Sequence, residues 1–178
     1  MPKLLLCMLI SFTLFSCKKN GQKGTAIDVS HQVYYDNLGN VLLSDGGISR
    51  GYTFNSNEMA FFNSLDTANL NGTIRPATVN VFCCYPNPTY VTRGDKIGFN
   101  FGASSTSHVV VKYVIVDSVS TPLLKKVTHL YIPAGTYTAY DNIDPASLPV
   151  GRFRVYLTLS AESNDNFYTL WNNIERRN

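Results

Sequence analysis

Three residues near position 30 carry the side chains of an acid, a nucleophile and a base. Asp28, Ser30 and His31 are the residue types that relay a proton to a serine hydroxyl in hydrolases. Such catalysis needs the groups to converge. On an extended strand Asp28 and Ser30 would point to one side and His31 to the other. The spacing therefore argues against a nucleophilic site here.

Metal-binding patterns are weak along the whole chain. Asp141, Asn142 and Asp144 form a loose run of oxygen ligands of the kind that calcium prefers, but Asp144-Pro145 more simply begins a turn. The histidines are isolated, and none stands at Cys-x-x-Cys or His-x-x-x-His spacing: His31, His108 and His129. We expect no metal and no cofactor.

A glycine-rich segment, Asp45-Gly46-Gly47, lacks the lysine and the helix start of a phosphate-binding loop, so we expect it to form a turn. With no converging nucleophile, carboxylate pair or ligand set, we expect the protein not to be an enzyme. A hydrolase or a metal enzyme is the alternative.

The four cysteines do not make a disulfide framework. Cys7 and Cys17 lie in the first seventeen residues, which leaves the adjacent pair Cys83-Cys84. Neighbouring side chains on a strand point to opposite faces, so a bond between these two would distort the peptide. We expect two small apolar residues packed in and around a core strand, with a redox or metal role as the alternative.

The N-terminus has the pattern of an export signal. Lys3 is followed by an apolar run from Leu4 to Phe15, the small Ser16 and then Cys17, after which the chain turns polar. This run is too short to span a bilayer. Leu14-Phe15-Ser16-Cys17 resembles the lipobox of bacterial lipoproteins, which implies cleavage before Cys17 and acylation of its thiol. An ordinary secretory signal, with Cys17 incidental, is the alternative.

Four segments follow from this interpretation. We expect a lipoprotein signal peptide at 1–16, a flexible tether at 17–25, an N-terminal strand and short-helix region at 26–76 and a β-sandwich domain at 77–178. By resemblance to lipoproteins, lysines after the cysteine imply delivery to the outer membrane, with the periplasmic or surface face left open. The partner there would be the membrane, through lipid on Cys17.

Charge excludes one class of partner. The net charge is only +3, and the lysines and arginines are scattered rather than clustered on one segment. Nucleic-acid binding needs a concentrated basic surface. We therefore expect no nucleic-acid partner, and we keep a protein or a glycan as possible partners.

The N-terminal region predicts a hairpin and a helix. Two short strands, at 26–35 and 41–43, flank a turn-rich loop. From Asn55 to Leu65 a short helix is expected, because Asn55 and Glu58 fit a capping box and apolar residues recur at spacings of three. A strand with an apolar patch is the alternative there.

From Ala77 onward the chain alternates between apolar and polar residues in short strands. Clear examples are 79–83, 97–101 and 152–159, while 109–116 is apolar on both faces except for Lys112. Further strands are expected near 128–132, 136–143 and 167–174. Seven or eight such strands predict a mainly β fold, an immunoglobulin-like antiparallel β-sandwich with a small N-terminal hairpin and short-helix region.

The second half also resembles a known family. Tyr85-Pro86-Asn87-Pro88-Thr89, the strand 97–101, the strand 111–117 ending in an aspartate, and Leu148-Pro149-Val150-Gly151 resemble the C-terminal sorting domains of the type IX secretion system. We expect Pro86 and Pro88 to end a strand in a tight exposed turn, and Gly151 to allow a sharp turn. Segment 18–76 leaves little room for a cargo, so we expect the domain to be retained.

Binding is the role that the composition favours. The chain has eleven Tyr, ten Phe and one Trp, which is more aromatic residues than such a domain must bury. Tyrosine is well suited to recognition surfaces. A candidate binding face is formed by Arg152, Arg154 and Tyr156 on a late strand; a solvated face with arginine stems along it is the alternative. An edge strand accepting a partner's strand is another. The leading hypothesis is a non-catalytic, lipid-anchored envelope lipoprotein with a structural or partner-recognition role. The alternatives are a glycan-binding or adhesin-type accessory lipoprotein and a sorting domain on a short cargo.

Overall fold

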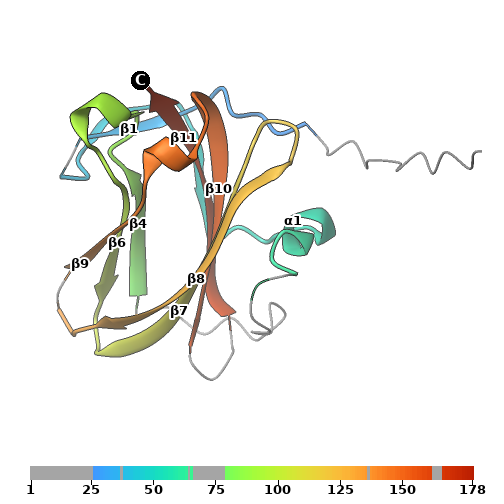
Figure 1. Cartoon of the computed structure of the whole chain (residues 1–178). Helices are drawn as coiled ribbons and strands as arrows, with labels where there is room; N and C mark the ends of the chain where they lie inside the picture. Colours follow the sequence, from blue (N-terminus) through green and yellow to red (C-terminus); the bar gives the residue numbers. More distant parts are fainter. Residues whose placement is uncertain (1–25, 37, 64, 66–78, 136, 162–165) are drawn as a thin grey trace, which may run out of the picture.

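The computed structural model describes residues 26–36, 38–63, 65, 79–135, 137–161 and 166–178 (Figure 1). It confirms the predicted mainly β, immunoglobulin-like antiparallel sandwich with a small N-terminal hairpin and one short helix. The elements in chain order are β1 (Val33–Tyr35), β2 (Val41–Ser44), β3 (Ile48–Arg50), α1 (Ser56–Ala60), β4 (Val79–Tyr85), β5 (Thr89–Tyr90), η1 (Val91–Arg93), β6 (Ile97–Ala103), β7 (Ser107–Val116), β8 (Pro122–Ile132), β9 (Tyr137–Ile143), η2 (Pro145–Ser147), β10 (Gly151–Ala161) and β11 (Asn166–Arg177).

Two sheets face each other across the core. The larger has the strand order β3-β11-β10-β7-β8, with β5 added parallel to β11, and the smaller has the order β4-β6-β9. A separate two-stranded sheet, β1-β2, crosses one end of the sandwich (Figure 1). Because β3 pairs with β11, the N-terminal region contributes a strand to the large sheet.

The predicted alternation builds the core. Ile97, Phe99 and Phe101 of β6 face the alternate apolar residues of β7 and β10 in one cluster of buried side chains. All eight residues from 109 to 116 are buried, because β7 lies between β10 and β8 and both of its faces are covered. This is the arrangement that the doubly apolar pattern predicted.

The N-terminal predictions hold in outline and differ in extent. β1 and β2 pair as an antiparallel hairpin, but residues 26–32 are not a strand. The backbone N–H and the hydroxyl of Ser30 both bond the Asp28 carboxylate, which bends the chain locally. α1 is shorter than expected, and it begins with the predicted capping box of Asn55 and Glu58.

The Pro-Asn-Pro segment differs most from its prediction. The exposed turn is wrong, because the Asn87 side chain is completely buried and Pro86 is buried beside it. Asn87 donates to the Val33 carbonyl at 2.6 Å and accepts from the Glu175 backbone at 2.8 Å. The segment therefore joins β1 to β11 inside the protein.

Two further buried amides extend this junction. Gln32 accepts from Asn87 at 3.2 Å and donates to the Val29 carbonyl at 2.8 Å, and Asn173 donates to the His31 carbonyl at 2.8 Å. We call these three side chains, Gln32, Asn87 and Asn173, the amide seam. They hold the N-terminal segment against β11, since each of these buried side chains bonds directly to backbone groups of the surrounding segments.

Two turns depend on backbone features that the sequence indicated. Asp45-Gly46-Gly47 is the turn between β2 and β3, where Gly46 has φ of +106°. A Cβ on Gly47 would lie 2.3 Å from the His31 carbonyl oxygen, so this close approach requires glycine. Gly151, with φ of +149°, allows the chain to turn into β10 as predicted.

The cysteine prediction is confirmed for the thiol that is described. Cys84 forms no disulfide and is fully buried in the core between the sheets. It lies at a bulge in β4, where its φ is +66° and the pairing register with β6 shifts. The Cys83 side chain lies outside the described residues.

Candidate functional site

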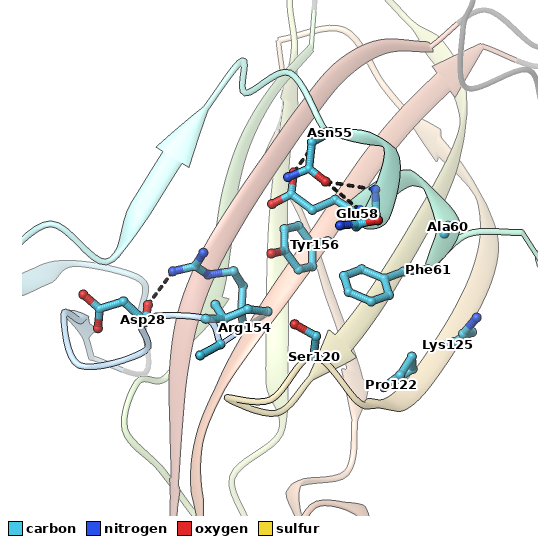
Figure 2. A pocket seen from close by; sticks show the side chains of 13 residues that line it. Asp28, Asn55, Glu58, Ala60, Phe61, Ser120, Pro122, Lys125, Arg154 and Tyr156 are labelled. Atoms are coloured by element: carbon cyan, nitrogen blue, oxygen red, sulfur yellow. Dashed lines mark hydrogen bonds between the residues drawn. The ribbon is translucent and has the colours of Figure 1, made fainter. Parts of the chain in front are cut away.

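A cavity of about 460 Å³ lies between α1, the N-terminal segment and the outer face of β10 (Figure 2). The three-stranded sheet covers the inner face of β10, and residues far away in the sequence cover part of the outer face. The polar and charged residues of the lining are Asp28, Asn55, Asn57, Glu58, Ser120, Lys125, Arg154 and Tyr156, and the rest are Ala26, Ile27, Ala60, Phe61 and Pro122. We call this cavity the α1 pocket.

Arg154 is held on three sides at one wall of the α1 pocket. Its Nε donates to the Asn173 side chain at 2.8 Å, and a terminal nitrogen donates to the Asp28 carbonyl at 2.5 Å. Its guanidinium lies 3.9 Å from the centre of the Trp171 ring. Planar stacking combined with directed hydrogen bonds fixes an arginine more firmly than either alone. The positive charge at this wall is therefore positioned before any ligand arrives.

Glu58 supplies a carboxylate to the α1 side of the pocket. Its carboxylate accepts from the Asn55 backbone N–H at 2.9 Å and from the Tyr52 hydroxyl at 3.4 Å, and the side chain is buried. The Asn55 side chain in turn accepts from the Asn57 and Glu58 backbone N–H groups at 3.0 Å each. The capping box thus places the carboxylate as well as starting the helix.

Aromatic rings form the wall between these charges. Phe61 and Tyr156 lie with ring centres 5.5 Å apart, and Figure 2 shows both above Ser120 and Pro122. Phe54 meets Tyr156 edge to face at the same centre distance. Burial, and next the nearby Glu58 carboxylate, raises the pKa of the Tyr156 phenol. Tyr156 is therefore a neutral phenol at physiological pH.

The structure brings two of the three predicted binding residues into one site. Arg154 and Tyr156 both line the α1 pocket, whereas Arg152 lies exposed beside it and donates to the Ser30 carbonyl at 3.1 Å. The face is not an open platform, because Tyr156 is only 1% exposed beneath Phe54 and Phe61. A binding role for these three residues stays a prediction.

The acid, nucleophile and base near position 30 are closer together than a strand would allow. The Ser30 hydroxyl donates to Asp28 at 2.5 Å, and the His31 ring lies 3.8 Å from the same carboxylate. The hydrogen bonds from Ser30 lower the Asp28 pKa. The predicted separation of Asp28 and His31 is therefore wrong. The serine proton points to the acid and not to the base, and all three residues are exposed, so the geometry is that of a turn.

The candidate calcium run divides in a similar way. Asp144 accepts from the Ala146 backbone N–H at 3.0 Å at the start of η2 and pairs with Lys96 at 3.3 Å, so it begins a turn. The Asp141 and Asn142 side chains lie outside the described residues, as does Cys17. Within the described part of the chain, no group of three or more His, Cys, Asp or Glu side chains is placed to hold a metal ion.

Several pocket residues had no signal in the sequence. The sequence predicted no site for the segment and the hairpin that supply Ile27, Ser120, Pro122 and Lys125. The two meet where the Ile27 backbone N–H donates to the Ser118 carbonyl. Glu58 was predicted as a cap, and nothing in the sequence indicated that it also lines a cavity. The excess of aromatic residues was the one available hint.

Comparisons with known proteins place this chain in no family. No family model and no curated protein matches it. Among solved structures, a Niemann-Pick type C2 protein from Japanese carpenter ant aligns over 61% of this chain and 96% of its own length, with 9% identity and a TM-score of 0.34. That likeness is too low to carry an argument about this protein. Among the described helices, none is both long and apolar enough to cross a bilayer.

Proposed function

We propose that this protein is a lipid-anchored envelope lipoprotein whose β-sandwich serves recognition and not catalysis. In this proposal Cys17 carries the acyl chains, the segment to residue 25 is a tether, and the α1 pocket is the binding site. The protein would reside in the cell envelope, at the outer membrane.

The observation that carries the recognition role is the fixed arrangement of charges around the α1 pocket. Arg154 is held by Asn173, Asp28 and Trp171, and Glu58 by its capping box. Groups that are already ordered lose little conformational entropy when a ligand binds, which favours affinity. The same commitment argues against general acid or base catalysis, because both Glu58 carboxylate oxygens already accept hydrogen bonds within the protein, from the Asn55 backbone and the Tyr52 hydroxyl.

A glycan is the ligand class that the lining favours among the alternatives. Amide side chains of Asn55 and Asn57, a carboxylate and a guanidinium surround the partly exposed ring of Phe61, which packs on the buried Tyr156. Sugars present hydroxyl groups to planar polar side chains and C–H faces to aromatic rings. A pocket of about 460 Å³ has the size of a small-molecule site.

The anchor is tested by cell fractionation with protease shaving. Wild-type chain should partition with membranes and carry a lipid-modified residue 17 by mass spectrometry, while Cys17→Ala should be released. A wild-type chain with a free, unmodified N-terminus in the soluble fraction would refute the anchor. Intact-mass analysis also tests the sorting-domain alternative, which requires residues 77–178 to be lost from the mature chain.

The proposed binding in the α1 pocket is tested by substituting two arginines of β10 in turn. Polysaccharides and envelope peptides are screened against the chain with Cys17→Ser, and then against Arg154→Met and Arg152→Met. Both residues lie on the outer face of β10, but only Arg154 lines the α1 pocket. Recognition in the pocket predicts loss of binding with Arg154→Met alone. Equal loss in both variants would place binding elsewhere.

A further inference from the structure

Four aliphatic side chains gather in solvent at the tip of the β1–β2 hairpin. Leu38 is 81% exposed, Val41 60%, Leu42 68% and Leu43 61%. Single exposed leucines are ordinary on protein surfaces, whereas four within six residues form a patch that usually meets a partner. The tip lies at the end of the sandwich that the N-terminal segment also crosses (Figure 1).

An aromatic and cationic border lies beside these residues. A shallow groove is lined by Tyr35, Asp36, Leu38, Leu42, Pro86, Pro88, Tyr90 and Arg93. The Asp36 carboxylate in it accepts hydrogen bonds from Leu38 and Asn40. The Arg93 guanidinium lies 3.9 Å from the centre of the Tyr90 ring, and Arg177 donates to the Tyr90 hydroxyl at 3.1 Å. Tyrosine and arginine combine an apolar body with a polar end, which suits the boundary between acyl chains and headgroups.

The hairpin is a poor template for a partner's strand. β2 has only four residues, and its pairing with β1 is irregular between Tyr34 and Tyr35. Short and bulged edge strands are features that discourage strand addition. Strand addition also draws its affinity from backbone hydrogen bonds and does not require consecutive aliphatic residues on both faces of the edge. The exposed aliphatic side chains of β2 therefore favour the acyl region of a membrane as the partner over a peptide strand.

The proposed lipid anchor would hold the hairpin close to a membrane. Ala26 follows Cys17 by nine residues, which span at most roughly 30 Å when extended. β1 begins seven residues after Ala26, so the hairpin is the first element that follows the tether. Among the described strands β2 pairs with β1 alone, so the backbone groups on its other edge must stay hydrated, and this limits the depth of insertion.

We propose that Leu38, Val41, Leu42 and Leu43 form a membrane-docking tip that inserts into the outer acyl region of the bilayer holding Cys17. The inference rests on the proposed lipid anchor and adds an orientation to it. The tip side chains lie at the acyl boundary, Tyr90 and Arg93 lie at headgroup level, and the β2 backbone stays in the hydrated zone.

A chain without lipid separates the tip from the anchor. The Cys17→Ser chain should float with vesicles of phosphatidylethanolamine and phosphatidylglycerol, and Val41→Asp should weaken that binding about tenfold or more. Val119→Asp is the matched control, because Val119 is 56% exposed in the turn between β7 and β8. Equal weakening by both substitutions would overturn the proposal.

The depth to which the tip inserts is measured on the lipidated chain, because the lipid anchor holds that chain on the membrane independently of the tip. Leu42→Trp should be quenched by lipids brominated near the headgroup end of the acyl chain, above the signal of the native Trp171. An unquenched tryptophan on a membrane-bound chain would overturn the docking tip and leave the anchor intact. Conversely, a soluble wild-type chain whose Cys17→Ser form still binds vesicles through the tip would refute only the anchor.

Concentration-dependent dimers of the Cys17→Ser chain that Val41→Asp dissociates would show that a second copy covers the tip, and would also overturn docking.

Discussion

The N-terminal segment meets the sandwich in two ways, along the amide seam and across the α1 pocket. At the seam the side chains of Gln32, Asn87 and Asn173 are at most 1% exposed and bond directly to backbone groups on both sides. At the pocket the same large sheet is covered incompletely, and charged side chains border a cavity of about 460 Å³. The contact is closed at the seam and open at α1, and this opening is the part of the contact to which we assign the proposed binding role.

Asn173 connects the two regions. Its amide nitrogen serves the seam through the His31 carbonyl, and its oxygen accepts from Arg154 at the pocket wall. Rigidity in one region thus positions a charge in the other. The comparison predicts that seam substitutions lower stability more than pocket substitutions do, and that only the latter change binding selectively.

The largest loss of stability is expected for Asn87→Ala. The substitution leaves the Val33 carbonyl and the Glu175 N–H buried without their partner, and each such group costs about 1–3 kcal/mol. We expect the free energy of unfolding to fall by about 3 kcal/mol or more, measured by urea denaturation. A loss no larger than that of Asn55→Ala at the pocket would erase the distinction between the two regions.

Gly47→Ala should come next, because it tests how tightly the chain is closed beside the seam. The added Cβ would meet the backbone at His31 and Gln32, which cannot move without breaking seam contacts. Overpacking of this kind typically costs about 1–3 kcal/mol. Gly135→Ala is the control, since it requires positive φ but has open space around it. Gly47 is not among the positive-φ glycines, so unchanged stability of Gly47→Ala would mean that the close approach does not demand glycine there.

How far the sequence predicted the fold follows from how local each feature is. The alternation of β10 and the capping box at Asn55 lie within a few residues, and both were predicted correctly. Asn87 was misplaced on an exposed turn, because its partners Val33 and Glu175 stand 54 and 88 positions away. Pro86 and Pro88 indicated that the strand ends there, but not which residues pack against this segment.

The site was predicted in part for the same reason. Arg154 and Tyr156 stood out as polar-face residues of a strand, and both line the pocket. What covers that face is a segment more than 90 positions earlier, held by contacts such as Ile27 to Ser118. The apolar–polar periodicity of a strand indicates which face each residue occupies. It does not indicate which distant segment of the chain covers that face, so the cavity could not be predicted.

Asn55→Ala sharpens the comparison from the pocket side. Removing this cap should lower stability by about 0.5–2 kcal/mol, because the Asn57 and Glu58 N–H groups lose their acceptor. It should also loosen the helix that carries Glu58, so ligand binding should weaken while the seam stays intact. Hydrogen exchange of β1 and β11 amides reports on the seam, with exposed Asn63→Ala as the control. Faster exchange of β1 amides would mean that the two regions unfold as one.

The smallest effect at neutral pH is expected for Tyr156→Phe, and it becomes distinctive in alkali. The Tyr156 pKa is raised above its ordinary value of about 10 by burial and then by Glu58, so the folded state holds the phenolic proton longer than the unfolded chain does. The stability that this provides is complete below about pH 10 and is lost as the pH rises through the raised pKa. Urea denaturation across that range should therefore show a steeper alkaline decline for the wild type than for Tyr156→Phe. Tyr131→Phe, at a tyrosine that is 55% exposed, is the control for removing a phenolic hydroxyl at the surface. Identical slopes for the wild type and Tyr156→Phe would mean that water reaches the phenol and that the aromatic wall of the pocket is not dry.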